Sequence, residues 1–164
     1  MSNKWNIPNI PHKGWTLDDV YDVREDGQSA DDTEYETCMM CNNERIRFVH
    51  VISHREVDES FKVGCVCAEK MTNDYVNPKR LETALRNKAS RRENWTNKKW
   101  KTSQNGNYFL TIEDRHLLIY TDKKTKKFKC KIKDTFGKKS FDTLKQAKIA
   151  VFNGIEYMKE NGDW

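Results

Sequence analysis

The sequence predicts an α+β protein built from small modules rather than around one large core. Of its 164 residues, 34% are charged and only 36% are hydrophobic, which is too few for a single extensive core. Four of the five cysteines lie between Cys38 and Cys67. The last third of the chain alternates polar and apolar residues and then changes to helical spacing. Aromatic residues make up 11%, too many for a disordered chain.

Residues 1–37 form an acidic N-terminal segment with a net charge of −6. Within it, residues 15–21 predict either a short helix capped by Thr16 or a strand, and residues 25–36 predict an acidic loop. The segment lacks the apolar run of a signal peptide, and no stretch of about 18 apolar residues occurs in the chain. We therefore expect a cytoplasmic protein without a membrane partner, in which clustered cysteines bind metal rather than form disulfides.

Residues 38–77 predict a small module in the order knuckle, hairpin, helix. A Cys-x-x-Cys turn opens it, and the β-branched and aromatic residues 46–53 predict the first strand of the hairpin. Residues 61–63 predict the returning strand, and Gly64 ends it. A helix is expected over residues 67–71. Such a hairpin has almost no core of its own, so a bound metal is expected to stabilise it.

The four cysteines of this module have the spacing of a tetrahedral zinc site. Cys38 and Cys41 place two thiolates on one side of the metal, and in an extended segment Cys65 and Cys67 also face one side. Alternatively, only Cys67 binds, from a helix N-terminus that stabilises its thiolate. The fourth ligand is then a histidine of the hairpin, either His50 or His54. A third interpretation, four ordinary buried thiols, explains the spacing less well.

Three stretches carry a family resemblance: residues 38–41 (Cys-Met-Met-Cys), residues 46–50 (Ile-Arg-Phe-Val-His) with His54, and residues 63–71 (Val-Gly-Cys-Val-Cys-Ala-Glu-Lys-Met). This pattern resembles an uncharacterised family of small bacterial and phage proteins thought to bind zinc. The resemblance covers most of the chain and implies bound zinc but no particular activity. The module also looks like a treble clef, a scaffold shared by many nucleic-acid-binding proteins and by HNH nucleases, although a fold likeness does not decide function.

Residues 78–104 predict a basic helix. Residues 78–102 have a net charge of +7, so like charges repel one another along the helix. A bound polyanion would relieve that repulsion, and counterion release would add affinity. Trp95 and Trp100 lie within this run and are more typical of core anchors than of base-stacking residues. The candidate nucleic-acid contacts are Arg86, Lys88, Arg91, Arg92, Lys98 and Lys99, although a solvated helix face explains the same charges.

Residues 105–164 predict a βββα domain, a three-stranded antiparallel sheet with a C-terminal helix. The strand patterns lie at residues 108–112, 115–121 and 127–133. Apolar residues then recur every three or four positions after a cap at Thr143 or the residue before it.

The last of these strands alternates lysine with apolar residues. Phe128, Cys130 and Ile132 are expected to face the helix. The opposite, open face of the sheet should then carry Lys127, Lys129, Lys131 and Lys133. This arrangement resembles the DNA-binding sheets of AP2 domains and some integrase arm domains in architecture only. Lysines also protect sheet edges and aid solubility, which explains the same pattern without a ligand.

The charge distribution favours a nucleic-acid-binding protein that contacts phosphates mostly without reading sequence, with DNA expected more than RNA. One alternative, favoured by the acidic residues 18–36, is a protein-interaction or inhibitor protein of phage or mobile-element origin that acts on a host system. A second alternative is a divergent HNH-like nuclease, with a base at His50 or His54 and a second metal at Asn73 or Asp74. Because the chain lacks a Gly-rich phosphate loop and a nucleophile elbow, we expect no enzymatic activity.

Overall fold

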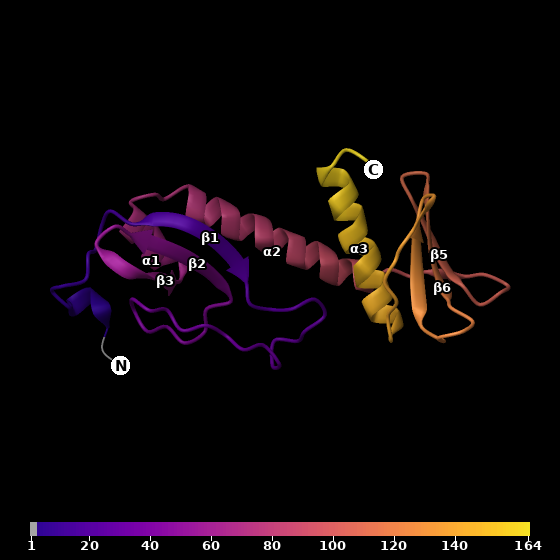
Figure 1. The fold of residues 1–164 in the computed structure, drawn as a ribbon, viewed down its shortest axis with the longest axis horizontal. Coiled ribbons are helices and arrows are strands. Elements are labelled where there is room, and N and C mark those ends of the chain that lie inside the picture. The colour runs from indigo at the N-terminus through magenta and orange to yellow at the C-terminus, as the bar shows by residue number, and fades with distance from the viewer. Residues whose placement is uncertain (1–2) are drawn as a thin grey trace. The chain divides into compact units, whose positions relative to one another are not determined.

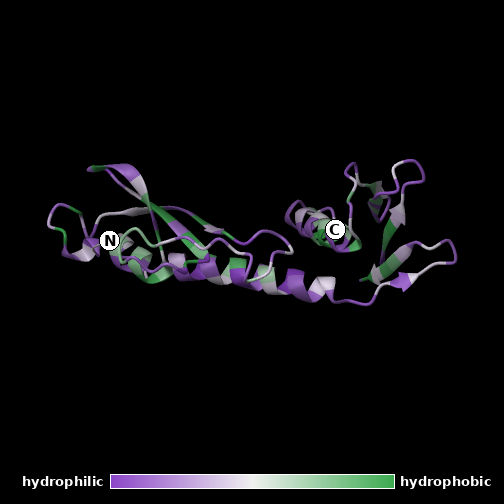
Figure 2. Cartoon of the chain, turned by 90° about the horizontal axis from the view of Figure 1, so that it is seen from below, coloured by the Kyte–Doolittle hydropathy of each residue, from purple (hydrophilic) through white to green (hydrophobic). Residues whose placement is uncertain are grey.

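The computed structural model describes residues 3–164 and confirms the α+β class, with three α-helices and antiparallel sheets in that range. The chain divides into two compact units, unit 1 (residues 1–89) and unit 2 (residues 90–164) (Figure 1). The longest helix, α2 (Asn77–Thr96), contributes residues to both units. Its visible turns are mostly hydrophilic (Figure 2). Within the described range, no helix has the length and apolar character needed to cross a membrane.

Unit 1 contains a three-stranded antiparallel sheet in the order β1-β2-β3. The strands are β1 (Thr16–Asp22), β2 (Phe48–His54) and β3 (Val57–Val63). Of the two alternatives for residues 15–21, the structure shows the strand. Strand β1 pairs with β2 from Thr16 opposite Ser53 to Asp22 opposite Phe48. The acidic N-terminal segment therefore supplies an edge strand to the sheet of unit 1.

A short helix follows the hairpin of unit 1. Helix α1 (Cys65–Thr72) begins directly after Gly64, two residues earlier than the sequence predicted. It ends at Asn73, which adopts the left-handed conformation with φ 52°. Near the N-terminus, a single 3₁₀ turn η1 (Lys4–Asn6) is tied to the knuckle, because the Lys4 N–H donates to the Met40 carbonyl at 2.8 Å.

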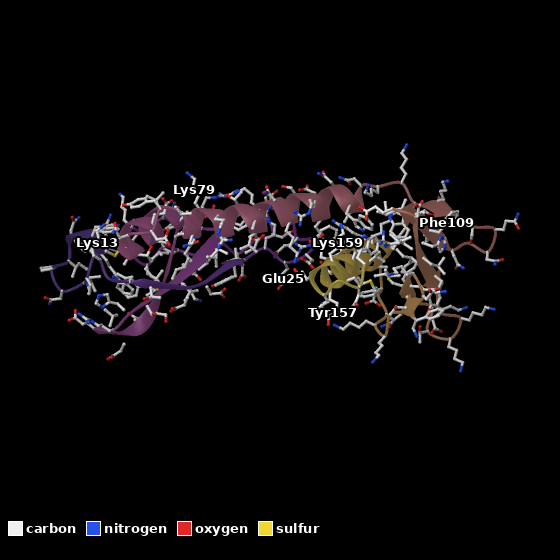
Figure 3. The ribbon with its side chains drawn as sticks, turned by 90° about the horizontal axis from the view of Figure 1, so that it is seen from above. Lys13, Glu25, Lys79, Phe109, Tyr157 and Lys159 are labelled. Atoms are coloured by element: carbon white, nitrogen blue, oxygen red, sulfur yellow. The ribbon has the colours of Figure 1, made fainter. Side chains whose placement is uncertain are left out.

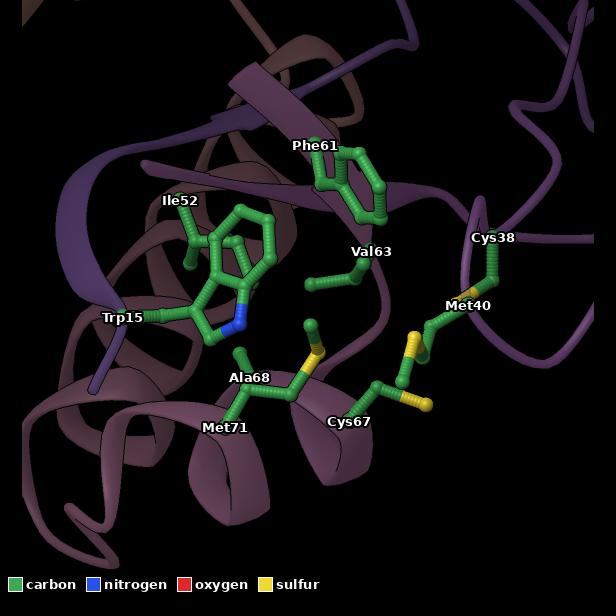
Figure 4. Packing of buried hydrophobic residues seen from close by; sticks show 9 residues of the cluster. All are labelled: Trp15, Cys38, Met40, Ile52, Phe61, Val63, Cys67, Ala68 and Met71. Atoms are coloured by element: carbon green, nitrogen blue, oxygen red, sulfur yellow. The ribbon is translucent and has the colours of Figure 1, made fainter. Parts of the chain in front are cut away.

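The core of unit 1 forms around one aromatic pair. The rings of Trp15 and Phe61 have centroids 4.7 Å apart, and the Trp15 indole N–H donates to the Pro11 carbonyl at 2.8 Å. The tryptophan is thus buried with its polar atom satisfied. Cys38 and Cys67 lie at one side of the same cluster (Figure 4). The candidate metal ligands therefore continue the hydrophobic core of this unit.

Unit 2 contains a five-stranded antiparallel sheet whose strands follow sequence order. The three predicted strands are its central members, β5 (Tyr108–Ile112), β6 (Arg115–Thr121) and β7 (Phe128–Ile132). The expectation of three strands is corrected by two short edge strands, β4 (Lys101–Thr102) and β8 (Thr135–Phe136). A strand of two residues is too short to show the alternation from which strands are predicted.

Helix α3 (Leu144–Glu160) lies along one face of this sheet, as predicted (Figure 1). Its cap is Thr143, whose hydroxyl accepts the Gln146 N–H at 3.1 Å, while the Gln146 side chain accepts the Thr143 N–H at 3.2 Å. This reciprocal capping box fixes the start of the helix. Gly154 allows close approach to the sheet, because a Cβ there would lie 2.6 Å from Cδ1 of Ile132.

The core of unit 2 lies between α3 and the sheet and includes the end of α2. Trp95 is 7% exposed, donates its indole N–H to the Lys148 carbonyl at 2.8 Å, and packs edge-to-face on Trp100. Both tryptophans are therefore core anchors, as expected. The other buried members of this core are Leu117, Ile119, Cys130, Ile132, Ala147, Val151, Phe152 and Ile155.

Candidate metal centre and open sheet face

Three of the four clustered cysteines come together in unit 1. The sulfur atoms of Cys38, Cys41 and Cys67 all lie within 4.8 Å of one another, close enough to bind a metal ion. Around zinc such sulfurs sit roughly 3.5–4 Å apart, so small side-chain rotations suffice. No fourth cysteine, histidine or carboxylate of residues 3–164 joins this group within that distance. We call this set the three-cysteine site.

The backbone shapes the knuckle that carries the first two ligands. The Asn42 N–H donates to the Cys38 carbonyl at 2.9 Å, and the Cys38 N–H donates to the Asn43 carbonyl at 2.8 Å. Asn42 has φ 63°, a left-handed conformation that asparagine tolerates better than most residues. These bonds close the tight turn that brings Cys41 to the same side as Cys38.

Hydrogen bonds also stabilise negative charge at the three-cysteine site. The Cys67 thiol donates to Cys38, and the N–H groups of Cys41, Gly64 and Met40 donate to the same sulfur, which together lower the pKa of Cys38 to about 5 despite burial. The hydrogen bond to Cys38, followed by burial and by the charge on Cys38, raises the pKa of Cys67. Ionisation of one thiol of this pair therefore opposes ionisation of the other. A divalent cation would offset that repulsion and allow the thiols to ionise together.

Cys65 does not join the three-cysteine site. Because α1 begins at Cys65, two positions along the chain correspond to a rotation of about 200° on the helix, and Cys65 and Cys67 face different sides. The thiol of Cys65 donates to a Glu69 carboxylate oxygen at 3.3 Å. Burial, followed by Glu69 and Glu82, raises the pKa of Cys65 to about 12. Its sulfur belongs to a second group of possible ligands, with His50 and Glu82.

The structure separates the two histidines proposed as a fourth ligand. His54 packs against Trp15 in a tilted arrangement with ring centroids 5.2 Å apart, and its Nδ1 accepts the Glu56 N–H at 3.0 Å. His50 is fully buried, and its Nε2 lies 3.2 Å from the Pro78 carbonyl oxygen. Neither histidine lies in the three-cysteine site.

The two residues considered as ligands of a second nuclease metal lie between α1 and α2 and cap the ends of these helices. Asn73 is the C-cap of α1. Asp74 accepts the N–H groups of Val76 and Asn77 at 2.9 Å each, and this holds the start of α2. These backbone bonds lower the pKa of Asp74, Asn77 being the first contributor.

Most of the basic residues proposed for a helix over residues 78–104 are engaged within the protein, and α2 ends at Thr96, before Lys98 and Lys99. Arg86 pairs with Glu82 at 2.6 Å, and Arg91 pairs with Glu156 at 3.0 Å. Arg92 lies over a ring of the unit 2 core and Lys98 lies over Trp95. Lys99 is exposed and Lys88 is half-buried. The charge of α2 is thus partly neutralised inside each unit.

In unit 2, the face of the sheet turned away from α3 combines rings and lysines. Because Leu117, Ile119, Cys130 and Ile132 face the core, the residues between them face the other way. Pairing places Phe109 opposite Leu118, Leu118 opposite Lys131, and Lys131 opposite Phe136, in one row across four strands. Tyr120 and Lys129 form the next pair. We call this surface the open sheet face.

A hollow of about 760 Å³ lies on the open sheet face. Tyr120 and Phe136 meet edge-to-face across it with centroids 6.2 Å apart, and Phe136 is 59% exposed. Lys131 lies over the Phe136 ring at 4.8 Å. The rim carries Asn107, Lys123 and Lys126.

Two of the four predicted lysines lie on this face and two have other contacts. Lys129 and Lys131 are on the open face, where Lys129 pairs with Asp122 at 3.2 Å. Lys127 precedes β7 and pairs with Asp142 at 3.3 Å. Lys133 follows β7 with φ 55° and donates to the Asp163 carbonyl beyond α3. Strand β7 ends before Lys133, so the alternation of side chains between the two sheet faces does not extend to this lysine.

Comparisons with protein-family models, with curated proteins and with solved structures found no match. Function must therefore be inferred from the chain itself. Sequence reasoning missed two features, the group around His50 and the rings of the open sheet face. The rings had a signal, since Phe109 and Tyr120 have the opposite parity to the core residues Leu110 and Ile119.

Proposed function

We propose that this chain is a zinc-stabilised nucleic-acid-binding protein that holds its ligand on the open sheet face of unit 2. The observation that carries this proposal is the uncovered row of Phe109, Lys131 and Phe136 beside the Tyr120 hollow. Unit 1 is proposed to be a treble-clef-like module in which zinc joins Cys38 and Cys41 to Cys67.

The charge of unit 2 supports a polyanionic ligand. Residues 90–164 hold 18 Lys and Arg and nine Asp and Glu, a net charge of +9, whereas residues 1–89 have a net charge of −4. Lysines on the rim of the hollow can neutralise phosphates and release counterions. A small-molecule pocket would not need a charge excess that extends over the whole unit.

The exposed rings favour unstacked bases over duplex phosphates alone. Tyr120 and Phe136 present aromatic surface inside the hollow, and each base stacked on such a ring contributes about 1–3 kcal/mol. Stacking is tolerant of sequence, so the proposal implies weak sequence preference. We propose single-stranded DNA as the ligand, with RNA as an outcome of the test.

Helix α2 takes a smaller part in this proposal than the sequence implied. Arg86 and Arg91 form close ion pairs within the protein, so neutralising them would change stability as well as charge. Lys99 is exposed and Lys88 is half-buried, and both remain candidate secondary contacts.

Fluorescence anisotropy with labelled 20-nucleotide single strands and duplexes, of DNA and RNA, tests the proposal over a salt series. Phe136→Ala and Tyr120→Ala should each weaken single-strand binding about 5- to 150-fold. Lys123→Ala with Lys126→Ala should reduce the slope of log K against log salt by about 1.4.

A charge-matched control is Lys148→Ala with Lys159→Ala, since both residues belong to α3 on the other side of the sheet. In Figure 3, Lys159 projects from α3 whereas Phe109 belongs to the sheet. The control should leave most of the affinity intact. Absence of any binding at low salt, or equal losses in the control and rim variants, would reject the open sheet face as the binding surface.

A further inference from the structure

Three potential metal ligands from three different elements of unit 1 converge away from the three-cysteine site. His50 comes from β2, Cys65 is the first residue of α1, and Glu82 lies on α2. One ligand atom from each lies within 4.8 Å of the other two. This set shares no residue with the three-cysteine site, so a metal bound here would be a second ion.

The surroundings of His50 point to a missing ligand. Its side chain is 0% exposed, and its Nε2 faces two acceptors, the Pro78 carbonyl at 3.2 Å and a Glu82 carboxylate oxygen at 3.7 Å. Its Nδ1 is buried with no hydrogen-bond partner among the described residues. A buried polar atom without a partner costs about 1–3 kcal/mol. Metal-bound histidines commonly bind through one nitrogen and donate through the other to a carbonyl or carboxylate.

The charges around Cys65 also favour a cation. Its thiol contacts Glu69, and Glu82 lies close by, so two carboxylates surround one sulfur. Arg86 pairs with Glu82 through Oε1 at 2.6 Å, and the second oxygen, Oε2, is the one that faces His50. Glu82 therefore keeps one oxygen for this group. The side chain of Glu82 is 17% exposed, so solvent reaches one side of the group.

We propose that unit 1 binds a second divalent metal ion, zinc, through His50, Cys65 and Glu82. A thiolate, an imidazole and a carboxylate are the three kinds of side chain that zinc accepts. A water molecule completes the tetrahedron on the side that solvent reaches. Three protein ligands with a solvent-accessible fourth position distinguish this site from a closed structural one. The site does not depend on nucleic-acid binding by unit 2.

Metal stoichiometry of the full chain tests the proposal. Metal-free protein is titrated with Co²⁺, whose absorption spectrum reports thiolate ligation. Native mass spectrometry of the zinc-loaded protein then gives the number of bound ions from the mass of the complex. The wild type should bind two ions. Cys65→Ser and Glu82→Gln should each bind one ion tightly, with affinity for the second reduced at least tenfold.

Cys130→Ser and Glu59→Gln are matched controls, because Cys130 belongs to unit 2 and Glu59 is exposed on β3. Both should retain two ions. Glu82→Gln preserves size and can be checked for folding by circular dichroism, so a lost ion is not confused with a lost fold. If the wild type binds one ion that Cys65→Ser abolishes, Cys65 is a ligand of the first site and the proposal is wrong. One ion unaffected by either variant, with Cys65 freely alkylated, also overturns it.

Discussion

Replacing Cys67 with serine removes the only ligand that α1 contributes to the three-cysteine site. Cys67 joins α1 to the knuckle inside the core of unit 1, so metal loss should loosen the knuckle, the hairpin and α1 together. Unit 2 has its own core of apolar side chains around Trp95 and contains none of the residues of the three-cysteine site. We therefore expect unit 1 to unfold while unit 2 remains folded.

The size of the effect follows from mass action. Zinc present at a thousandfold excess over its dissociation constant stabilises a folded site by about 4 kcal/mol. A small domain has a total stability of about 5–15 kcal/mol, so this is a large share of it. Loss of the site should lower the protection of β2 amides against hydrogen exchange about a thousandfold.

Hydrogen exchange read by mass spectrometry resolves the two units in one experiment. Peptides from β2 and β3 should exchange rapidly in Cys67→Ser, and peptides from β6 and β7 should not change. Adding a chelator to Cys67→Ser should have no further effect on the three-cysteine site. Cys130→Ala, the control in unit 2, should leave β2 protected. Unchanged protection of β2 in metal-free Cys67→Ser would refute a stabilising metal.

Three further predictions test other parts of the structure. Thr143→Ala should lower the free energy of unfolding of unit 2 by about 1 kcal/mol through loss of the capping box, and urea denaturation would measure it. Gly154→Ala should change the stability of unit 2 by less than about 1 kcal/mol, because the helix propensity of alanine offsets the displacement of Ile132 Cδ1 from its 2.6 Å approach; in an Ile132→Val background, where that atom is absent, the same change should stabilise unit 2 by about 0.5–1 kcal/mol. Full additivity of the two changes in a double-mutant cycle would contradict this explanation. Chelation should change oligonucleotide affinity by less than twofold, because the open sheet face belongs to unit 2; a parallel loss of metal and binding would place the nucleic-acid surface elsewhere.

The elements with a strong period were predictable from the sequence. Strands β5, β6 and β7 and helix α3 were found because each alternates or repeats over at least five residues. Strand β1 could not be distinguished from a helix, since only its pairing with β2 settles the question. Only the lysines of the open sheet face were predicted, because their alternation is visible within one strand. The row of rings depends on the pairing register of four strands, which the sequence does not show.

The cysteine ligands show where sequence spacing stops being informative. In a Cys-x-Cys segment, an extended backbone places both sulfurs on one side and a helical backbone separates them by about 200°. The sequence indicated a helix from Cys67, yet Gly64 already serves as the N-cap, and this shift of two residues moves Cys65 to another group. The same shift brings Cys65 to His50 and Glu82, one of which is 15 residues upstream and the other 17 residues downstream. The start of one short helix thus decides whether Cys65 can join a four-cysteine site or belongs to a separate group, and the metal stoichiometry of Cys65→Ser distinguishes these two outcomes.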